Sequence, residues 1–186
     1  FDLRTTWFTG PECPLQGMKH SVSYSKTLAA DLQASWSVLR DFGSIIHWVR
    51  GGEDGSISIS GTGIGMTRDL NLPSVGKVQH CLEEMDEANH LIAYSLTRGQ
   101  PLGMQEYVVS ISLRASADGC DMKWEGEFDA APEVNAEELA SNLKHAYEGM
   151  TELFDQFAGS QKHLTKNLER GTKLKIRPCS ILTVGR

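Results

Sequence analysis

The sequence lacks the features that mark membrane, secreted or disulfide-built proteins. None of its 186 residues belongs to an apolar run of the roughly 20 residues that a membrane helix needs, so we expect no stable membrane insertion. The first residues show no charged, apolar and cleavage-site succession typical of a secretion signal. Its four cysteines form no CxxC pair and no zinc-ligand spacing. We therefore expect reduced thiols and a cytoplasmic location.

Basic residues are also few: the sequence has 18 Lys and Arg and 24 Asp and Glu, which gives a net charge of −6. This balance disfavours a nucleic-acid partner. The basic residues that are present gather near the C-terminus, where a tail can bind nucleic acid or anionic lipid, although a solvated or vector-derived extension explains them more simply. We interpret residues 1–18 as an N-terminal extension, 19–159 as one domain and 160–186 as a basic C-terminal extension.

Motifs for nucleotides, metals and covalent catalysis are absent as well. The stretch GTGIGMTRDL at 61–70 has GxGxG spacing where a dinucleotide site needs GxGxxG, and an alternating strand follows it in place of a helix. Its glycines fit a tight turn between strands. The sequence contains no GxxxxGK[ST], no HExxH and no nucleophile elbow. We therefore predict no cofactor and no metal site.

Alternating apolar and polar residues are what the sequence has in abundance. This period of two is typical of half-buried strands, and short Gly, Asn and Asp turns separate the segments. Such short turns join antiparallel neighbours, because a parallel crossover needs a dozen or more residues. The predicted strands are 20–28, 56–60, 66–72, 77–86, 90–98, 105–115 and 120–129.

Helical spacing appears in two places. After the first strand, the pattern predicts short helices at about 31–41 and 43–48, with Asp31 as an N-cap. The longest apolar stripe runs over 135–159, with Asn135 as its N-cap. A half-buried sheet must cover its apolar face, and this last helix is the only large element left to do so. The fold class is therefore α+β, with about seven antiparallel strands and one long C-terminal helix.

Several short motifs occur in a characteristic order and spacing: SWSVLRDFGSIIHW (35–48), GTGIGMTRDLNLP (61–73), LEEMDEANHLIAYSL (82–96) and MKWEGEFDAAP (122–132). In these motifs, over roughly residues 20–158, the chain resembles the polyketide cyclase/dehydrase and lipid-transport family of the START-like, or SRPBCC, helix-grip superfamily. The resemblance implies a curved sheet that grips the long helix around a deep cavity, and it implies hydrophobic ligands such as lipids or polyketides.

Strand parity places several polar side chains on apolar faces. Arg68 offers a fork of donors for a ligand carboxylate or phosphate, or it makes a structural ion pair or snorkels to solvent. His80 is a candidate acid or base, although a lone histidine on such a face is more often hydrogen-bonded structure. Tyr24, Tyr94 and Tyr107 either donate to a ligand carbonyl or belong to an aromatic core.

Two function classes follow from this interior. The first is a carrier or sensor that binds a hydrophobic or amphipathic small molecule. The alternative is a cyclase- or dehydrase-like enzyme that uses His80, Arg68 and Tyr107 for acid–base chemistry without a cofactor. We expect a monomer or homodimer. The remaining candidate ligand-binding residues are Trp48, Met66, Trp124, Tyr147, Met150 and Phe154, for which core packing is the plainer interpretation.

Overall fold

The computed structural model describes residues 20–169, and the side chains of residues 20–161. The predicted N-terminal extension 1–18 and most of the predicted C-terminal extension lie outside these residues. Among the residues described, no helix combines the length and the apolar composition needed to cross a bilayer.

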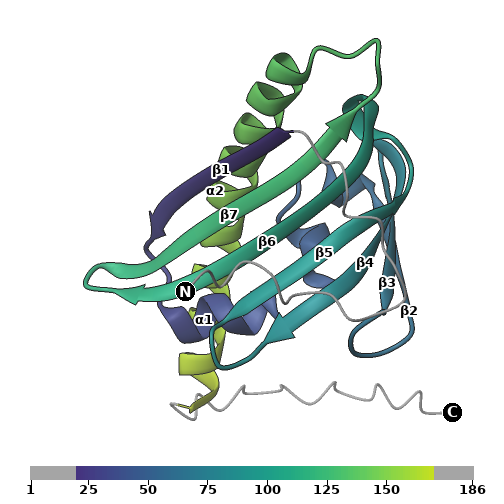
Figure 1. The fold of residues 1–186 in the computed structure, drawn as a ribbon. Helices are drawn as coiled ribbons and strands as arrows, with labels where there is room; N and C mark the ends of the chain where they lie inside the picture. Colours follow the sequence, from purple (N-terminus) through teal and green to yellow (C-terminus); the bar gives the residue numbers. More distant parts are fainter. Residues whose placement is uncertain (1–19, 170–186) are drawn as a thin grey trace, which may run out of the picture.

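A single sheet of seven strands forms the body of the protein (Figure 1), and every neighbouring pair is antiparallel. The spatial order is β1-β7-β6-β5-β4-β3-β2, so the first strand pairs with the last. The predicted strand number, order along the chain and antiparallel pairing are confirmed. The strands are β1 His20–Leu28, β2 Ser56–Ser60, β3 Thr67–Leu72, β4 Gly76–Asp86, β5 Leu91–Arg98, β6 Met104–Ser116 and β7 Gly119–Ala130.

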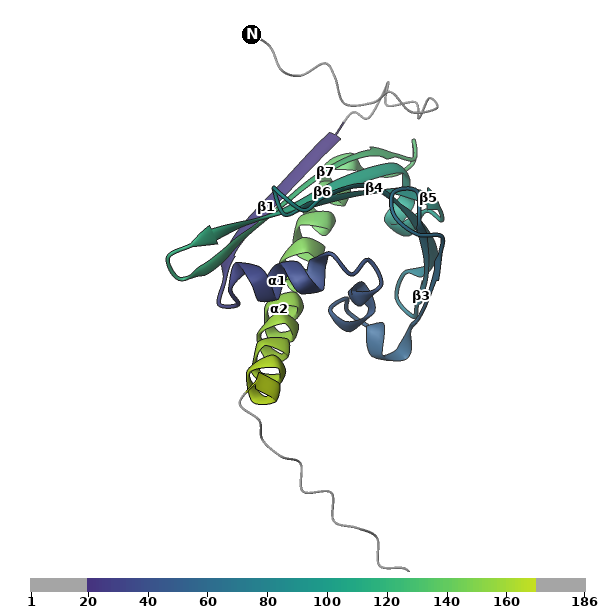
Figure 2. The ribbon, with the colours of Figure 1, turned by 90° about the horizontal axis from the view of Figure 1, so that it is seen from below.

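The long helix α2, Ala136–Glu169, lies against β1 and β7, and α1, Leu32–Leu39, packs across it. Figure 2 shows both helices on the same side of the sheet, which curves around them. Three 3₁₀ turns complete the fold: η1 Ser44–His47, η2 Gly52–Asp54 and η3 Pro101–Gly103. This arrangement confirms the predicted helix-grip fold.

Two helices differ from their predicted form. The second short helix is only the 3₁₀ turn η1, and a further turn, η2, follows it. At the other end of the chain, α2 continues ten residues beyond the predicted end at Gly159. One helical glycine costs only about 1 kcal/mol, and no further Gly or Pro follows until Gly171, so Gly159 does not stop the helix.

Alternation along the strands divides the sheet into an inner and an outer face. In β7, buried and exposed residues alternate from Cys120 to Phe128. Trp124 and Phe128 are fully buried against the helices. Glu125 and Glu127 lie between these two residues in the sequence and are exposed on the outer face. There the Lys123 Nζ is 2.7 Å from a carboxylate oxygen of Glu125. The carboxylates of this strand therefore belong to a solvated surface.

The glycines of the 61–70 stretch turn the chain between β2 and β3. Gly61, Gly63 and Gly65 have φ angles of 84°, 69° and 86°, a region that other residues adopt at a steric cost. The turn ends where the Gly65 N–H donates to the carbonyl of Leu82 on β4. The interpretation of this motif as a strand-to-strand turn is confirmed.

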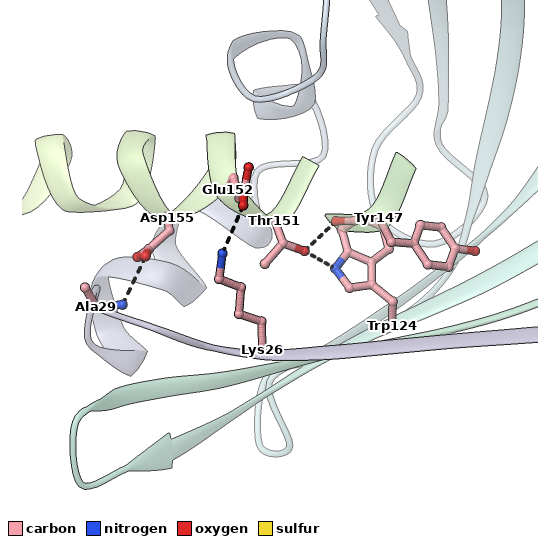
Figure 3. Close-up of polar contacts among 7 residues, drawn as sticks. All are labelled: Lys26, Ala29, Trp124, Tyr147, Thr151, Glu152 and Asp155. Atoms are coloured by element: carbon pink, nitrogen blue, oxygen red, sulfur yellow. Dashed lines mark hydrogen bonds and ion pairs between the residues drawn. The ribbon is translucent and has the colours of Figure 1, made fainter. Parts of the chain in front are cut away.

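Polar contacts fix α2 to the first and last strands (Figure 3). The Asp155 carboxylate accepts from the backbone N–H groups of Ala29 and Ala30 at 3.1 and 3.0 Å, where β1 ends. The Trp124 indole donates to the Thr151 hydroxyl at 3.0 Å, and this hydroxyl donates to the carbonyl of Tyr147 at 2.7 Å. These contacts hold the inner face of β7 in register with the helix.

Replacing Asp155 with Asn should lower the free energy of unfolding by about 1–2 kcal/mol, because an amide offers one oxygen where the carboxylate accepts two bonds. Glu152→Gln is the matched control. It removes the same charge from α2, but the contact with Lys26 that it breaks is solvent-exposed, and we expect a cost below about 1 kcal/mol. Urea denaturation measures both variants, and equal costs would contradict this role of Asp155.

Candidate functional site

The inner face of β3 and β4 carries a buried cationic side chain. Arg68 on β3 is directly opposite His80 on β4, and it is only 1% exposed. Alternation explains its direction, since Leu70 and Leu72 on the same face of the strand are also buried. Arg68 therefore points into the interior that the sequence analysis predicts for it.

Aromatic rings lie on either side of the Arg68 guanidinium. Its central carbon is 4.1 Å from the ring centroid of Phe42 and 4.3 Å from that of Tyr94. Nε donates to Nδ1 of His80 at 3.1 Å, and Nη1 donates to the backbone carbonyl of Phe42 at 3.0 Å. Burial lowers the pKa of Arg68, and the nearby Tyr94 phenol partly opposes that shift. The contacts with two rings spread favourable interactions over both faces of the cation.

Nη2 of Arg68 is fully enclosed and has no hydrogen-bond partner. The Tyr94 hydroxyl interacts favourably with the Arg68 charge, but no bond from Nη2 to it has the distance and angle of a hydrogen bond. In the described part of the chain, no carboxylate forms an ion pair with Arg68, since the pairs found there involve Lys26, Arg40 and Lys123. A buried charge without a counter-charge is expensive, and a structural role alone does not explain it.

His80 is half-buried as a residue, but its imidazole is enclosed by Arg68 and by Tyr94, whose ring centroid is 5.0 Å away. Burial, and then the positive charge of Arg68, hold the pKa of His80 well below its ordinary value. Because Nδ1 accepts the Arg68 N–H, the ring proton of the neutral imidazole is on Nε2. His80 therefore has no free basic nitrogen at neutral pH.

Two tyrosine hydroxyls meet deeper in the interior. Tyr107 on β6 and Tyr147 on α2 are hydrogen-bonded at 2.7 Å, and burial raises the pKa of both. Each hydroxyl carries one proton, and one of the two is used between them, so the pair can donate one hydrogen bond to a third group. The backbone of Gly126 makes room for this pair, because a Cβ there would be 2.2 Å from the Tyr147 oxygen.

Three further candidates, Trp48, Trp124 and Phe154, pack against one another and against Tyr147. The ring of Trp124 stacks on that of Tyr147 with centroids 4.8 Å apart, and Trp48 contacts Trp124 and Phe154 edge to face. All four side chains are at most 2% exposed. A cavity is predicted here, but aromatic rings fill this part of the interior, because the segment after α1 brings Trp48 between the sheet and α2.

The last three candidates lie at the margin of the interior. Met66 and Met150 are half-buried against the core. Tyr24 on β1 is near Lys26 and the acidic side chains of α2, and burial raises its pKa. The structure thus brings Arg68, His80, Tyr94, Tyr107 and Tyr147 together and leaves Tyr24 apart from them. Whether any of these residues touches a ligand stays a prediction.

Three surface hollows on the described residues have volumes of about 870, 560 and 320 Å³, and Arg68 lines none of them. The largest is a polar groove on the outer face that includes Ser110, Ser112 and Glu125. Arg68 is therefore out of reach of solvent in this conformation, and a molecule can contact Nη2 only if the covering side chains move.

Sequence reasoning missed two residues of this site. Phe42 supplies both a ring and a carbonyl to Arg68, yet it comes from the segment between α1 and η1 and has no periodic signal of its own. In the sequence, Gly126 is a single glycine between two glutamates and gives no direct sign of a site. An inward-facing glycine between Trp124 and Phe128 is the one hint that something large occupies the space above it.

Comparison with models of known protein families identifies the family of this chain. The family model described as polyketide cyclase / dehydrase and lipid transport matches residues 19–157. The chain belongs to this family. Its START-like fold and its family are consistent with the binding of a hydrophobic small molecule. No curated protein sequence matches the chain.

Solved structures share the fold of this family member at low identity. The protein XoxI from Bacillus cereus is 20% identical with a TM-score of 0.65, covering 78% of this chain and 99% of its own. An uncharacterised protein from Bacillus thuringiensis is 18% identical with a TM-score of 0.64, covering 75% and 98%. A norcoclaurine synthase mutant from Thalictrum flavum, in complex with a transition-state analogue, is 18% identical with a TM-score of 0.60, covering 77% and 96%. At these identities the likeness shows the fold alone.

Gly126→Ala should destabilise the protein by about 1–3 kcal/mol, because the new methyl group collides with the Tyr147 hydroxyl and separates it from Tyr107. In a Tyr147→Phe background the oxygen is gone, and the same substitution should cost less. A double-mutant cycle by chemical denaturation measures this coupling, for which we expect about 0.5–3 kcal/mol. Additive effects would show that the hydroxyl does not occupy this space.

Burial of neutral His80 should make stability fall in mild acid. The unfolded chain takes up a proton at an ordinary histidine pKa of about 6.5, whereas folded His80 does so only at lower pH. Stability is therefore lost as pH falls below about 6.5, by at most about 1.4 kcal/mol per pH unit from this group. His80→Gln, which keeps an acceptor for Arg68, should flatten urea-derived stability between pH 7 and 5. The control His145→Gln, exposed on α2, should retain the wild-type slope.

Proposed function

We propose that this protein is a carrier or sensor that binds a hydrophobic or amphipathic small molecule in its interior, between the inner face of the sheet and the helices. The observation that carries the proposal is the group of polar side chains in an otherwise apolar core: Arg68, His80, Tyr94, Tyr107 and Tyr147. A few placed polar groups among apolar walls are typical of small-molecule sites. The Thalictrum flavum enzyme, complexed with dopamine and hydroxybenzaldehyde, is an example of this fold holding small aromatic compounds.

Binding at this place requires a change of conformation, because Arg68 and the tyrosines near it are enclosed. The covering residue is Phe42, in the connection between α1 and η1, and both its ring and its carbonyl contact Arg68. Trp48, after η1, stays packed between β7 and α2. The connection around Phe42 has no regular structure and no sheet pairing, so it is less firmly tied than the strands beneath it. Displacing it exposes the polar group without breaking the sheet.

Electrostatics favour binding over acid–base catalysis. His80 is neutral with its basic nitrogen engaged by Arg68, and the tyrosine pair stays protonated because burial raises both pKa values. General acid–base chemistry works best with a group whose pKa is near the working pH. Among the described interior side chains, none meets that condition. The cyclase-like alternative therefore has the weaker support.

Titration with the neutral probes naphthalene-2-carboxamide and octanamide tests the binding proposal. In a ¹H–¹⁵N spectrum of the indole groups, an interior ligand should shift Trp48 and Trp124, whose N–H groups bond to Ser44 and Thr151. Trp36, bonded to Glu87 beside the β4–β5 turn, should shift less. Native mass spectrometry of the purified protein should in addition show a retained small compound that denaturation releases.

Ser112→Trp is the control for binding elsewhere, since it obstructs the outer groove and leaves the inner face intact. It should bind the probes as the unmodified protein does. Shifts confined to the backbone amide signals of Ser110 and Ser112 in the same type of spectrum, with the indole signals of Trp48 and Trp124 unmoved, would contradict an interior site. Chemical conversion of a retained compound would instead favour the enzyme.

A further inference from the structure

Building on the proposed interior site, we infer that its ligand is a monocarboxylate with an apolar body, and that Arg68 binds the carboxylate. The decisive feature is Nη2 of Arg68, a fully enclosed donor without a partner on a side chain that is 1% exposed. Native proteins rarely leave such a group unmatched. A guanidinium has five N–H donors, and two of them are used, by His80 and by the Phe42 carbonyl, which leaves three for a ligand.

The charge of the surroundings sets the charge of the ligand. The groups that face Arg68 are the Phe42 ring, the neutral imidazole of His80 and the Tyr94 and Tyr107 phenols, and burial keeps each of the phenols protonated. The site therefore carries a single positive charge. One negative charge neutralises it, whereas a phosphate dianion would leave an uncompensated negative charge in the same low-dielectric interior.

The geometry of the open donors also fits a carboxylate. Nε donates to His80, so the edge of the guanidinium left for a ligand with two acceptors is the Nη1–Nη2 edge, where Nη2 has no partner and Nη1 keeps one of its two N–H groups. Two parallel donors match the two oxygens of a planar carboxylate. Because Nη1 has a second N–H, the Phe42 carbonyl can keep its bond while the carboxylate binds.

Pairs of probes that differ only in charge test this inference. Octanoate is compared with octanamide, and naphthalene-2-carboxylate with naphthalene-2-carboxamide, by isothermal titration calorimetry at pH 7.5. We expect each carboxylate to bind at least about tenfold more tightly than its amide, as a charge-assisted bond to a buried partner implies. Octyl phosphate should bind more weakly than octanoate.

Arg68→Met, which keeps the apolar stem and removes the charge, should reduce the carboxylate preference to about twofold or less. Arg68→Lys should retain a preference for the anion, because it keeps the charge without the fork. Arg40→Met is the control, since Arg40 is exposed and paired with Glu87, and it should leave the preference unchanged. Circular dichroism establishes that each variant is folded before titration.

The possible results separate this inference from the proposed function. Equal binding of amide and carboxylate by the unmodified protein would overturn the anionic ligand and leave the interior site standing. A carboxylate preference that survives in folded Arg68→Met would overturn the role of Arg68. A stronger preference for octyl phosphate would overturn the single-charge argument. If no probe of either shape binds, both the inference and the proposed interior site fail.

Discussion

Burial of one guanidinium constrains the arrangement of the interior. Arg68 cannot be solvated, so its environment must compensate for the lost water, and it does so with two aromatic faces, one imidazole nitrogen and one backbone carbonyl. These contacts tie together β3, β4, β5 and the segment after α1. Phe42 over the sheet, the Nδ1 of His80 and the ring of Tyr94 all contact the same cation. What they leave unsatisfied is its net charge.

The opposite half of the interior is held differently. There the aromatic rings of Trp48, Trp124 and Phe154 fill the space between β7 and α2, and the polar atoms are matched in closed pairs, such as the Trp124 indole with Thr151. A fully matched, ring-filled region resists rearrangement, because any opening exposes apolar surface and breaks good hydrogen bonds. The unmatched region around Arg68 loses less on opening and gains a counter-charge when an anion enters. Ligand-linked motion is therefore expected on the β2–β4 side, with α2 and β7 as the fixed support.

Most of the fold could be predicted from the sequence because period-two alternation is clear in most of the strands, although β5 is apolar on both faces at its centre, and because the turns between the strands of the sheet are short. Where the signal was weak the prediction was less accurate. The second short helix became a 3₁₀ turn, and α2 ran past Gly159, since a single glycine does not end a helix supported by tertiary contacts. For the site, strand parity correctly directs Arg68 and His80 inward from their own sequence positions. It does not reveal that Phe42 covers them, because that contact joins segments 26 residues apart through an irregular connection.

The same limit explains why a cavity is harder to foresee than a fold. Strand parity directs Tyr107 and Trp124 inward, and the apolar stripe of the long helix directs Tyr147 inward, but neither pattern states whether these side chains meet each other or leave room. Here Gly126 decides the matter, because the absent side chain lets the Tyr147 hydroxyl reach the sheet and pair with Tyr107. The pair keeps one proton to donate and stays neutral, because burial raises the pKa of both hydroxyls. In the proposed site the charge is therefore supplied by Arg68, so the buried cation, not the hydroxyl pair, determines which ligands the interior accepts.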